Sequence, residues 1–154
     1  MSIVWEIVRW LSAASLGVFA GAMLTEGGVL VPFWRALAPE EFLRWYAANA
    51  DRLLAFFSPL TTAAGVLALV AAVGSFVQGH PGRWWAGLAL VVMLGIIATF
   101  FVYFEAVNTR FATAAIPADA VPGELARWAA WHDARTVASM VAFAAALLAA
   151  RQSP

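Results

Sequence analysis

The chain has 154 residues, 64% of them hydrophobic, and a mean hydropathy of +0.83. This composition is far more apolar than that of an ordinary soluble domain. Nine acidic and nine basic residues give a formal net charge of zero, which argues against a nucleic-acid partner. The sequence contains no cysteine, which excludes disulfides and thiolate metal sites.

Four long stretches without charged residues predict an all-α fold, an integral membrane four-helix bundle. A helix needs about 20 apolar residues to cross the hydrocarbon core of a bilayer. Two of the stretches meet that length alone, and the other two extend into helix that carries a few charges. We expect a single transmembrane domain over residues 1–154, with spanning helices at about 3–30, 51–78, 84–115 and 123–150.

The first helix is expected to end before Pro32, because a proline disfavours helix at the residue that precedes it. A second helix start follows at Pro39-Glu40-Glu41, with a proline and two acids in the first turn. Phe42, Trp45 and Tyr46 then recur at helical spacing. The pattern predicts a short interfacial helix over residues 39–49, lying on the membrane surface.

The connection between the second and third spanning helices, residues 78–83, contains two glycines and a proline. Such residues are typical of a turn. Its histidine, His80, is therefore expected to be solvated, whereas His132 is expected to lie inside the fourth helix.

Three ionisable residues on different helices are expected to reach one depth in the membrane. The rise of an α-helix puts Glu26 and Glu105 roughly 30 Å from the tryptophans near the start of their helices. It puts His132 roughly 27 Å from the end of the fourth helix, which runs in the opposite direction. Asn108 and Arg135 lie close to the same level. Intramembrane ionisable residues usually mark a functional site, and we expect Glu26 to face the bundle interior.

This group of residues permits three kinds of chemistry. The candidate metal ligands are Glu26, Glu105, Asn108 and His132. Such nitrogen and oxygen donors suit a transition metal ion, namely copper, iron, manganese or zinc. Without a metal, His132 would accept a proton while Arg135 holds an anionic substrate oxygen. The third interpretation is a buried polar network that fixes helix packing, with the carboxylates paired to Arg52 or Arg135.

The sequence resembles the anthrone oxygenase-like family of small four-helix membrane proteins. The matching residues are Gly17, Gly21, Gly27 and Pro32 in the first helix, Glu105 and Asn108 at the end of the third, and Trp131-His132-x-x-Arg135 in the fourth. Val107 stands where members commonly have a proline. The resemblance covers most of the chain. It implies oxidation of electron-rich aromatic compounds by dioxygen.

The leading hypothesis is a membrane oxidoreductase, an oxygenase of a lipophilic aromatic such as an anthrone or a quinol. The alternatives are a carrier or binding protein for a small molecule or ion, and a structural subunit that docks through its glycine-rich first helix. Polar residues are expected at one end of the bundle only, which argues against transport. We expect the lipid bilayer and a lipophilic substrate as partners. A homo-oligomer is a further possibility. We expect the protein to lie in a bacterial inner membrane, with both termini in the cytoplasm.

Overall fold

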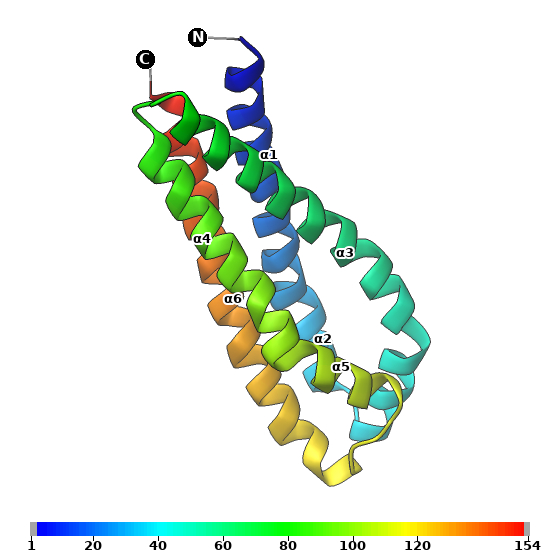
Figure 1. Cartoon of the computed structure of the whole chain (residues 1–154). Coiled ribbons are helices and arrows are strands. Elements are labelled where there is room, and N and C mark those ends of the chain that lie inside the picture. The colour runs from blue at the N-terminus through cyan, green and yellow to red at the C-terminus, as the bar shows by residue number, and fades with distance from the viewer. Residues whose placement is uncertain (1–2, 153–154) are drawn as a thin grey trace.

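The computed structural model describes residues 3–152. In that range the chain is helical apart from short turns and contains no β-strand, so the all-α prediction is confirmed (Figure 1). Its elements are α1 (Ile3–Thr25), η1 (Glu26–Leu30), α2 (Val31–Ala36), α3 (Pro39–Val77), α4 (Arg83–Thr99), η2 (Phe100–Phe104), α5 (Glu105–Ala112), η3 (Ala118–Ala120) and α6 (Val121–Arg151). They form four helical segments long and apolar enough to cross a membrane: Ile3–Ala36, Pro39–Val77, Arg83–Ala112 and Ala118–Arg151.

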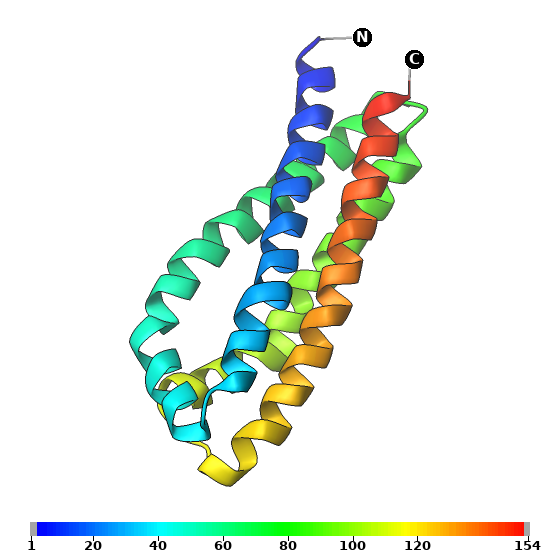
Figure 2. The same cartoon turned by 180° about the vertical axis from the view of Figure 1, so that it is seen from behind.

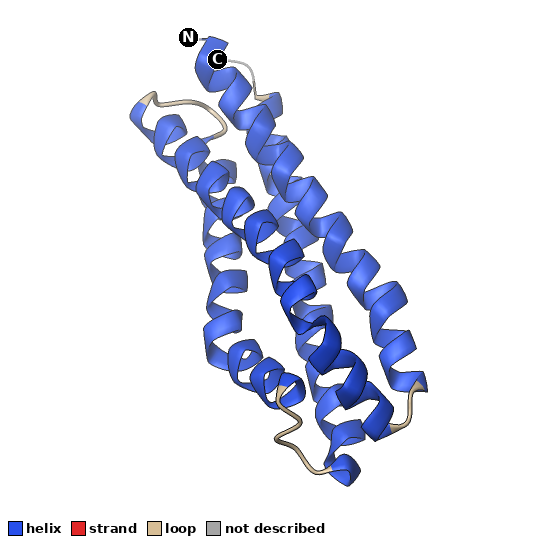
Figure 3. Cartoon of the chain, turned by 90° about the vertical axis from the view of Figure 1, so that its right-hand side faces the viewer, coloured by secondary structure: helices blue, strands red, loops and turns tan. Residues whose placement is uncertain are grey.

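The four segments form an antiparallel bundle. Helix α1 packs against α3 and α6, and α4 also packs against α3 and α6, so α1 lies diagonally opposite α4. The start of α1, the turn between α3 and α4, and the end of α6 lie together at one end of the bundle (Figures 1 and 2). Short loops connect the helices at both ends (Figure 3). This is the arrangement expected of a chain that crosses a bilayer four times.

Two different cores hold the bundle together. Near the chain ends and the membrane centre, the buried residues are mostly alanines with a few larger side chains such as Leu16, Phe19 and Met93. Small residues let helix backbones approach closely. At the opposite end the buried residues are large and aromatic: Trp34, Phe42, Tyr46, Phe104, Phe111 and Trp128. The predicted site lies at this aromatic end of the bundle.

The first segment does not end before Pro32 as predicted but continues to Ala36. Inside a helix, a proline lacks the N–H donor and clashes with the carbonyl four residues earlier. In the first turn of a helix that N–H has no partner anyway, so proline is tolerated there. The π-helical turn η1 directly precedes α2, with the Val31 N–H bonded to the Glu26 carbonyl five residues back. Pro32 therefore sits in the first turn of a renewed α-helix.

The predicted boundary between a surface helix over residues 39–49 and a spanning helix over residues 51–78 is also wrong. Both are parts of α3, which runs unbroken from Pro39 to Val77. The chain around Ala50 contains neither glycine nor proline, so nothing ends the helix there. Helix α3 contains an interior proline, Pro59, a residue that commonly kinks a helix. The helix bows away from the rest of the bundle (Figure 2).

The third segment ends at Ala112, three residues before the predicted position. Ala114 has a φ of 50°, the left-handed region, which stops the helix. Within this segment the π-helical turn η2 separates α4 from α5, again with an N–H bonded five residues back, from Glu105 to Phe100. The fourth segment, Val121–Arg151, agrees with the prediction within two residues.

Candidate functional site

A glutamate and a histidine from different helices meet in the interior. Glu26 is the first residue of η1 and only 7% of it is exposed, while His132 of α6 is fully buried. The Glu26 Oε2 lies 3.5 Å from the His132 Nδ1, a contact at ion-pair distance. Glu26 thus faces the bundle interior beside the fourth helix, as predicted. The sequence predicted that these two residues lie at the same depth, and in the structure they are in contact.

The other nitrogen of the imidazole, Nε2, has two neighbours. The His132 Nε2 lies 3.0 Å from the main-chain carbonyl oxygen of Met23 and 3.3 Å from the Thr136 Oγ1. The Thr136 hydroxyl donates to the His132 carbonyl, so its lone pairs face the ring. A carbonyl can only accept, so Nε2 carries a hydrogen. The Nδ1 nitrogen faces Glu26 at 3.5 Å and makes no hydrogen bond within the described residues.

The indole of Trp128 fixes the plane of this ring. The two rings stack with centroids 5.1 Å apart and planes 10° from parallel. The Trp128 Nε1 donates to the Asn108 Oδ1 of α5 at 2.9 Å. Asn108 therefore positions the histidine through Trp128, and the oxygen that was predicted to bind a metal accepts this hydrogen bond.

Arg135 lies one turn after His132 and interacts electrostatically with Glu26. Its guanidinium carbon sits 4.3 Å from the centroid of the Phe104 ring, and its Nη2 lies 3.6 Å from the Met23 sulfur. An aromatic face and a thioether are weak acceptors, so the guanidinium retains capacity for a stronger one. An anionic oxygen of a ligand would supply it.

A cavity of about 610 Å³ lies beside this pair. Its size is within the range of pockets that enclose small molecules. The walls come from α3, from the α4–α5 segment, and from Glu26, Trp128 and Arg135. His132 does not border the cavity and lies behind Glu26. Four charged residues line the cavity, and of these Glu26 is buried, Arg135 is half-buried, and Asp51 and Glu105 are exposed.

The predicted metal-ligand set is brought together only in part. Glu26 and His132 are in contact, whereas Glu105 borders the same cavity but is exposed. Within residues 3–152, no three His, Asp or Glu side chains come close enough to hold a metal ion. Arg52 bonds Asn49 on its own helix and takes no part in the buried group. The structure therefore adds no support for a transition metal site, and metal binding stays a prediction.

Both π-helical turns lie at the level of this site, and sequence reasoning missed them. Glu26 opens η1, and Glu105 directly follows η2. A π turn inserts an extra residue into a helix and frequently occurs at functional sites. The Glu26-Gly27-Gly28 run was one available signal for η1, whereas the aromatic run of η2 offers none. A Cβ on Gly27 would lie 3.3 Å from the His132 ring. The lack of a side chain at Gly27 therefore lets η1 lie close to this ring.

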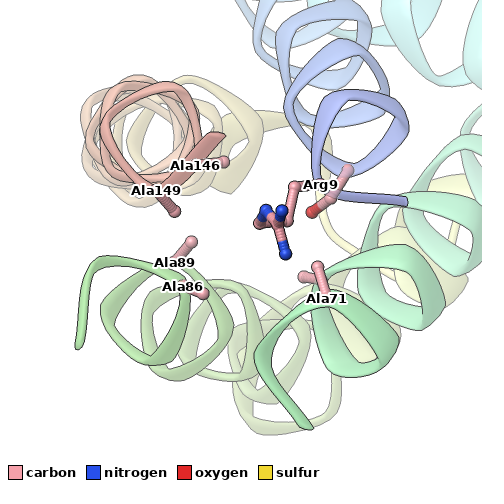
Figure 4. A pocket seen from close by; sticks show the side chains of 8 residues that line it. Arg9, Ala71, Ala86, Ala89, Ala146 and Ala149 are labelled. Atoms are coloured by element: carbon pink, nitrogen blue, oxygen red, sulfur yellow. The ribbon is translucent and has the colours of Figure 1, made fainter. Parts of the chain in front are cut away.

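A second group of buried polar residues lies near the chain ends, so the expectation of polar residues at one end only is wrong. Its members are Arg9, Ser12, Ser75 and His80. Arg9 points into a narrow gap lined by alanines of α3, α4 and α6 (Figure 4), with room for about one water molecule. A layer of buried apolar side chains, including Leu16 and Phe19, separates this group from Glu26.

His80 is buried, with 2% exposed, which corrects the prediction of a solvated loop histidine. The turn that carries it packs tightly on α6, since a Cβ on Gly82 would lie 2.6 Å from the Ala149 carbonyl oxygen. The His80 Nδ1 accepts a hydrogen bond from the Gly82 N–H at 3.0 Å. Burial, with a smaller effect of the nearby Arg9 charge, lowers the pKa of His80 below its usual value.

Fold and site together define a class: an integral membrane four-helix bundle with a buried glutamate–histidine pair against a cavity. No family model, no curated protein and no solved structure matches the chain. The function is therefore argued from the site itself.

Proposed function

We propose that this protein is a membrane oxidoreductase of the anthrone oxygenase-like kind, which oxidises a lipophilic aromatic with dioxygen. One observation carries the proposal: Glu26, with His132 in contact behind it, stands at the wall of a cavity large enough for an aromatic ring system. A carboxylate backed by an imidazole can accept a proton from a weakly acidic substrate. Arg135 in the same wall can hold the oxyanion that results.

The chemistry begins with loss of a proton. Glu26 takes it from a phenol or from the methylene of an anthrone, and His132 Nδ1 shares it. The substrate anion is electron-rich and reduces dioxygen. A quinol passes two electrons and gives a quinone and hydrogen peroxide, which takes up both protons, the second directly from the quinol and the first back from Glu26. An anthrone passes four electrons: one oxygen atom becomes the carbonyl, and the other leaves as water with both methylene hydrogens, the first of them returned by Glu26.

The roles of the two residues differ from those expected from sequence. His132 was expected to meet the substrate directly, but it lies behind Glu26 and borders no part of the cavity. We assign the first proton transfer to Glu26 and a positioning and proton-sharing role to His132. The Met23 carbonyl supports that role because it keeps the hydrogen on Nε2 and Nδ1 directed to Glu26.

The test is oxygen uptake by the purified protein in lipid nanodiscs, with an anthrone or a hydroquinone as substrate. We expect His132→Ala to lose at least about 100-fold in turnover, a typical effect of removing acid–base catalysis. A chelator should leave the wild-type rate unchanged. Inactivation by the chelator that one specific ion reverses would favour the metal-dependent version instead. A well-folded His132→Ala protein with full activity would leave the structural network as the better account.

We also propose that both termini face the cytoplasm of a bacterial inner membrane. An even number of spans keeps the termini on one side, which supports the first half of that statement. The site would then open near the outer face. We also propose that several copies can associate, which the open space beside Gly21 of α1 and Gly28 of η1 supports.

A further inference from the structure

The cavity beside Glu26 is longer than a fused-ring substrate needs. It follows one face of α3 from Tyr46 to Thr62, a distance of roughly 24 Å by helical rise. A rigid three-ring molecule spans less than half of that length. With its head against Glu26, such a ligand would leave the part of the cavity nearest the membrane centre empty.

The lining divides by polarity along this length. Towards the loops, the lining includes Asp51 of α3 and Glu105 and Asn108 of α5. Towards the membrane centre, the lining is mostly apolar: Leu53, Leu54, Phe57, Ile96, Ile97, Phe100 and Phe101. The polar exceptions in this half are the hydroxyls of Ser58, Thr61 and Thr62, of which Thr61 donates to the carbonyl of Phe57 on its own helix. The two halves therefore suit the two ends of an amphiphile.

The apolar half is open at the side of the bundle. Leu54 of α3 is 55% exposed and Phe101 of η2 is 67% exposed, although both line the cavity. Both residues lie in segments that are long and apolar enough to cross a membrane, so the opening faces hydrocarbon. Helix α3 bows outward on this side of the bundle (Figure 2). A ligand dissolved in the bilayer could reach the cavity without leaving the lipid.

We propose that the ligand is an amphiphile, a hydroxylated aromatic ring that carries a flexible apolar tail. The ring lies against Glu26 and Arg135, and the tail runs past Phe57 towards Ile97. This orientation is also that of a tailed quinol in one leaflet, with the head at the interface and the tail inward. The chemistry of the head rests on the proposed function, whereas the tail subsite is a binding property that needs no turnover.

The test compares benzoquinones that share one head and carry a methyl, hexyl or decyl tail. Binding to the protein in nanodiscs is followed by quenching of tryptophan fluorescence, with each concentration referred to the lipid phase. We expect the decyl compound to bind about tenfold tighter than the methyl compound, because its tail makes van der Waals contacts within the protein subsite. Equal affinities after this correction would overturn the proposal.

Two tryptophan substitutions place the subsite. Thr61→Trp fills the apolar half and should abolish the advantage of the long tail. Val66→Trp also introduces a tryptophan, but at an exposed position outside the cavity, and should leave the affinity advantage of the long tail unchanged. Equal loss in both, with retained folding by circular dichroism, would count against a specific tail site.

A measurement on the wild-type protein removes any dependence on folded variants. A decyl quinone with a photoreactive diazirine at the tail end should label the α3 and α4 segments around Thr61 and Ile97. Labels spread over lipid-facing residues such as Val66 and Leu69 would overturn the inference. Tail-dependent binding without oxygen uptake would contradict the proposed function alone. Equal turnover efficiency for tailed and tailless substrates would contradict the tail site alone.

Discussion

Glu26 and Glu105 carry the same charge and lie near one depth, yet the fold gives them different surroundings. Glu26 is buried and in contact with His132, whereas Glu105 is exposed at the cavity edge. A buried carboxylate needs a partner, and an exposed one does not. The proposed proton transfer thus depends on Glu26 and not on Glu105.

Substitution of each glutamate separates these roles. We expect Glu26→Gln to lower turnover by about 100-fold or more, because the amide cannot accept the substrate proton. Glu105→Gln has the same size and charge change and should stay within about threefold of wild type. Oxygen uptake in nanodiscs measures both. The reverse order of the two effects would mean that the wrong carboxylate has been assigned.

Protonation of His80 should weaken the chain-end half of the bundle. Its pKa in the folded protein is below the usual value of 6.5, so the fold favours neutral imidazole. As pH falls below about 6.5, the unfolded chain takes up a proton that the folded chain does not, and stability decreases. At higher pH neither state is protonated there, and the full stability is present.

The variant His80→Asn isolates this effect, because an amide oxygen can replace Nδ1 as acceptor from the Gly82 N–H without titrating. The melting temperature of the wild type should fall more than that of the variant between pH about 7.5 and about 5.5. Parallel curves for the two proteins would show that His80 does not titrate differently in the folded state.

At the residue level, depth could be predicted and contact could not. Helical rise alone brought Glu26 and His132 to one level. Their contact depends on helix rotation, which the π turn at Glu26 changes. The partner of Asn108 was missed for a similar reason, because Trp128 comes from another helix. His80 was mistaken because turn composition indicates solvent, and nothing local in the sequence shows that Gly82 packs on α6.

Among the elements, η1 places Glu26 and brings its helix against the histidine ring. The closest backbone position is Gly27, where a Cβ would lie 3.3 Å from both the Cδ2 and the Nε2 of His132. The ring would have to move by a few tenths of an ångström. Since Trp128 and Met23 hold it on other sides, the contact with Glu26 would change.

We expect Gly27→Ala to reduce kcat by roughly tenfold, because small displacements of catalytic groups have large effects. Gly21→Ala on the same helix is the matched control, since no atom lies within 4 Å of its added Cβ. That variant should keep its activity. Steady-state oxygen uptake and the melting temperature of each variant decide the matter. Unchanged kcat in Gly27→Ala would show that ring position is not critical.

The helices themselves were largely predictable, and their interruptions were not. Long uncharged runs identified the four spans because a bilayer demands about 20 apolar residues of each. The extension to Ala36 was missed because proline normally ends a helix, and here a π turn absorbs it. The unbroken α3 was missed because an amphipathic surface segment and the first turns of a long spanning helix have the same pattern.

For the whole molecule, four crossings place the turn at residues 78–82 and the connection at residues 113–120 on opposite faces of the membrane. The chain lacks cysteine, so single cysteines report without background. In bacterial cells, an impermeant maleimide should label Asp119→Cys from outside, and Gln78→Cys only after lysis. The opposite pattern would reverse the proposed orientation, and labelling of both from one side would contradict four spans.

The division of the core explains why a site exists at one end. Alanines pack the chain-end half closely, while aromatic residues hold the other half apart and leave the cavity beside α3. Composition could predict a hydrophobic helical bundle with aromatic residues at its ends. The location and shape of the cavity depend on the bend of α3 and on side-chain packing, which no single segment of sequence specifies.

The central claim is that Glu26, backed by His132, removes a proton from a hydroxylated aromatic in this cavity. The most direct measurement is the absorption spectrum of a tailed naphthol bound to the protein in nanodiscs at neutral pH without oxygen, since the anion absorbs at longer wavelength than the neutral form. The account predicts the anion spectrum in wild type and the neutral spectrum in Glu26→Gln. A neutral spectrum for naphthol bound to wild type, or an anion spectrum that persists in Glu26→Gln, would contradict it.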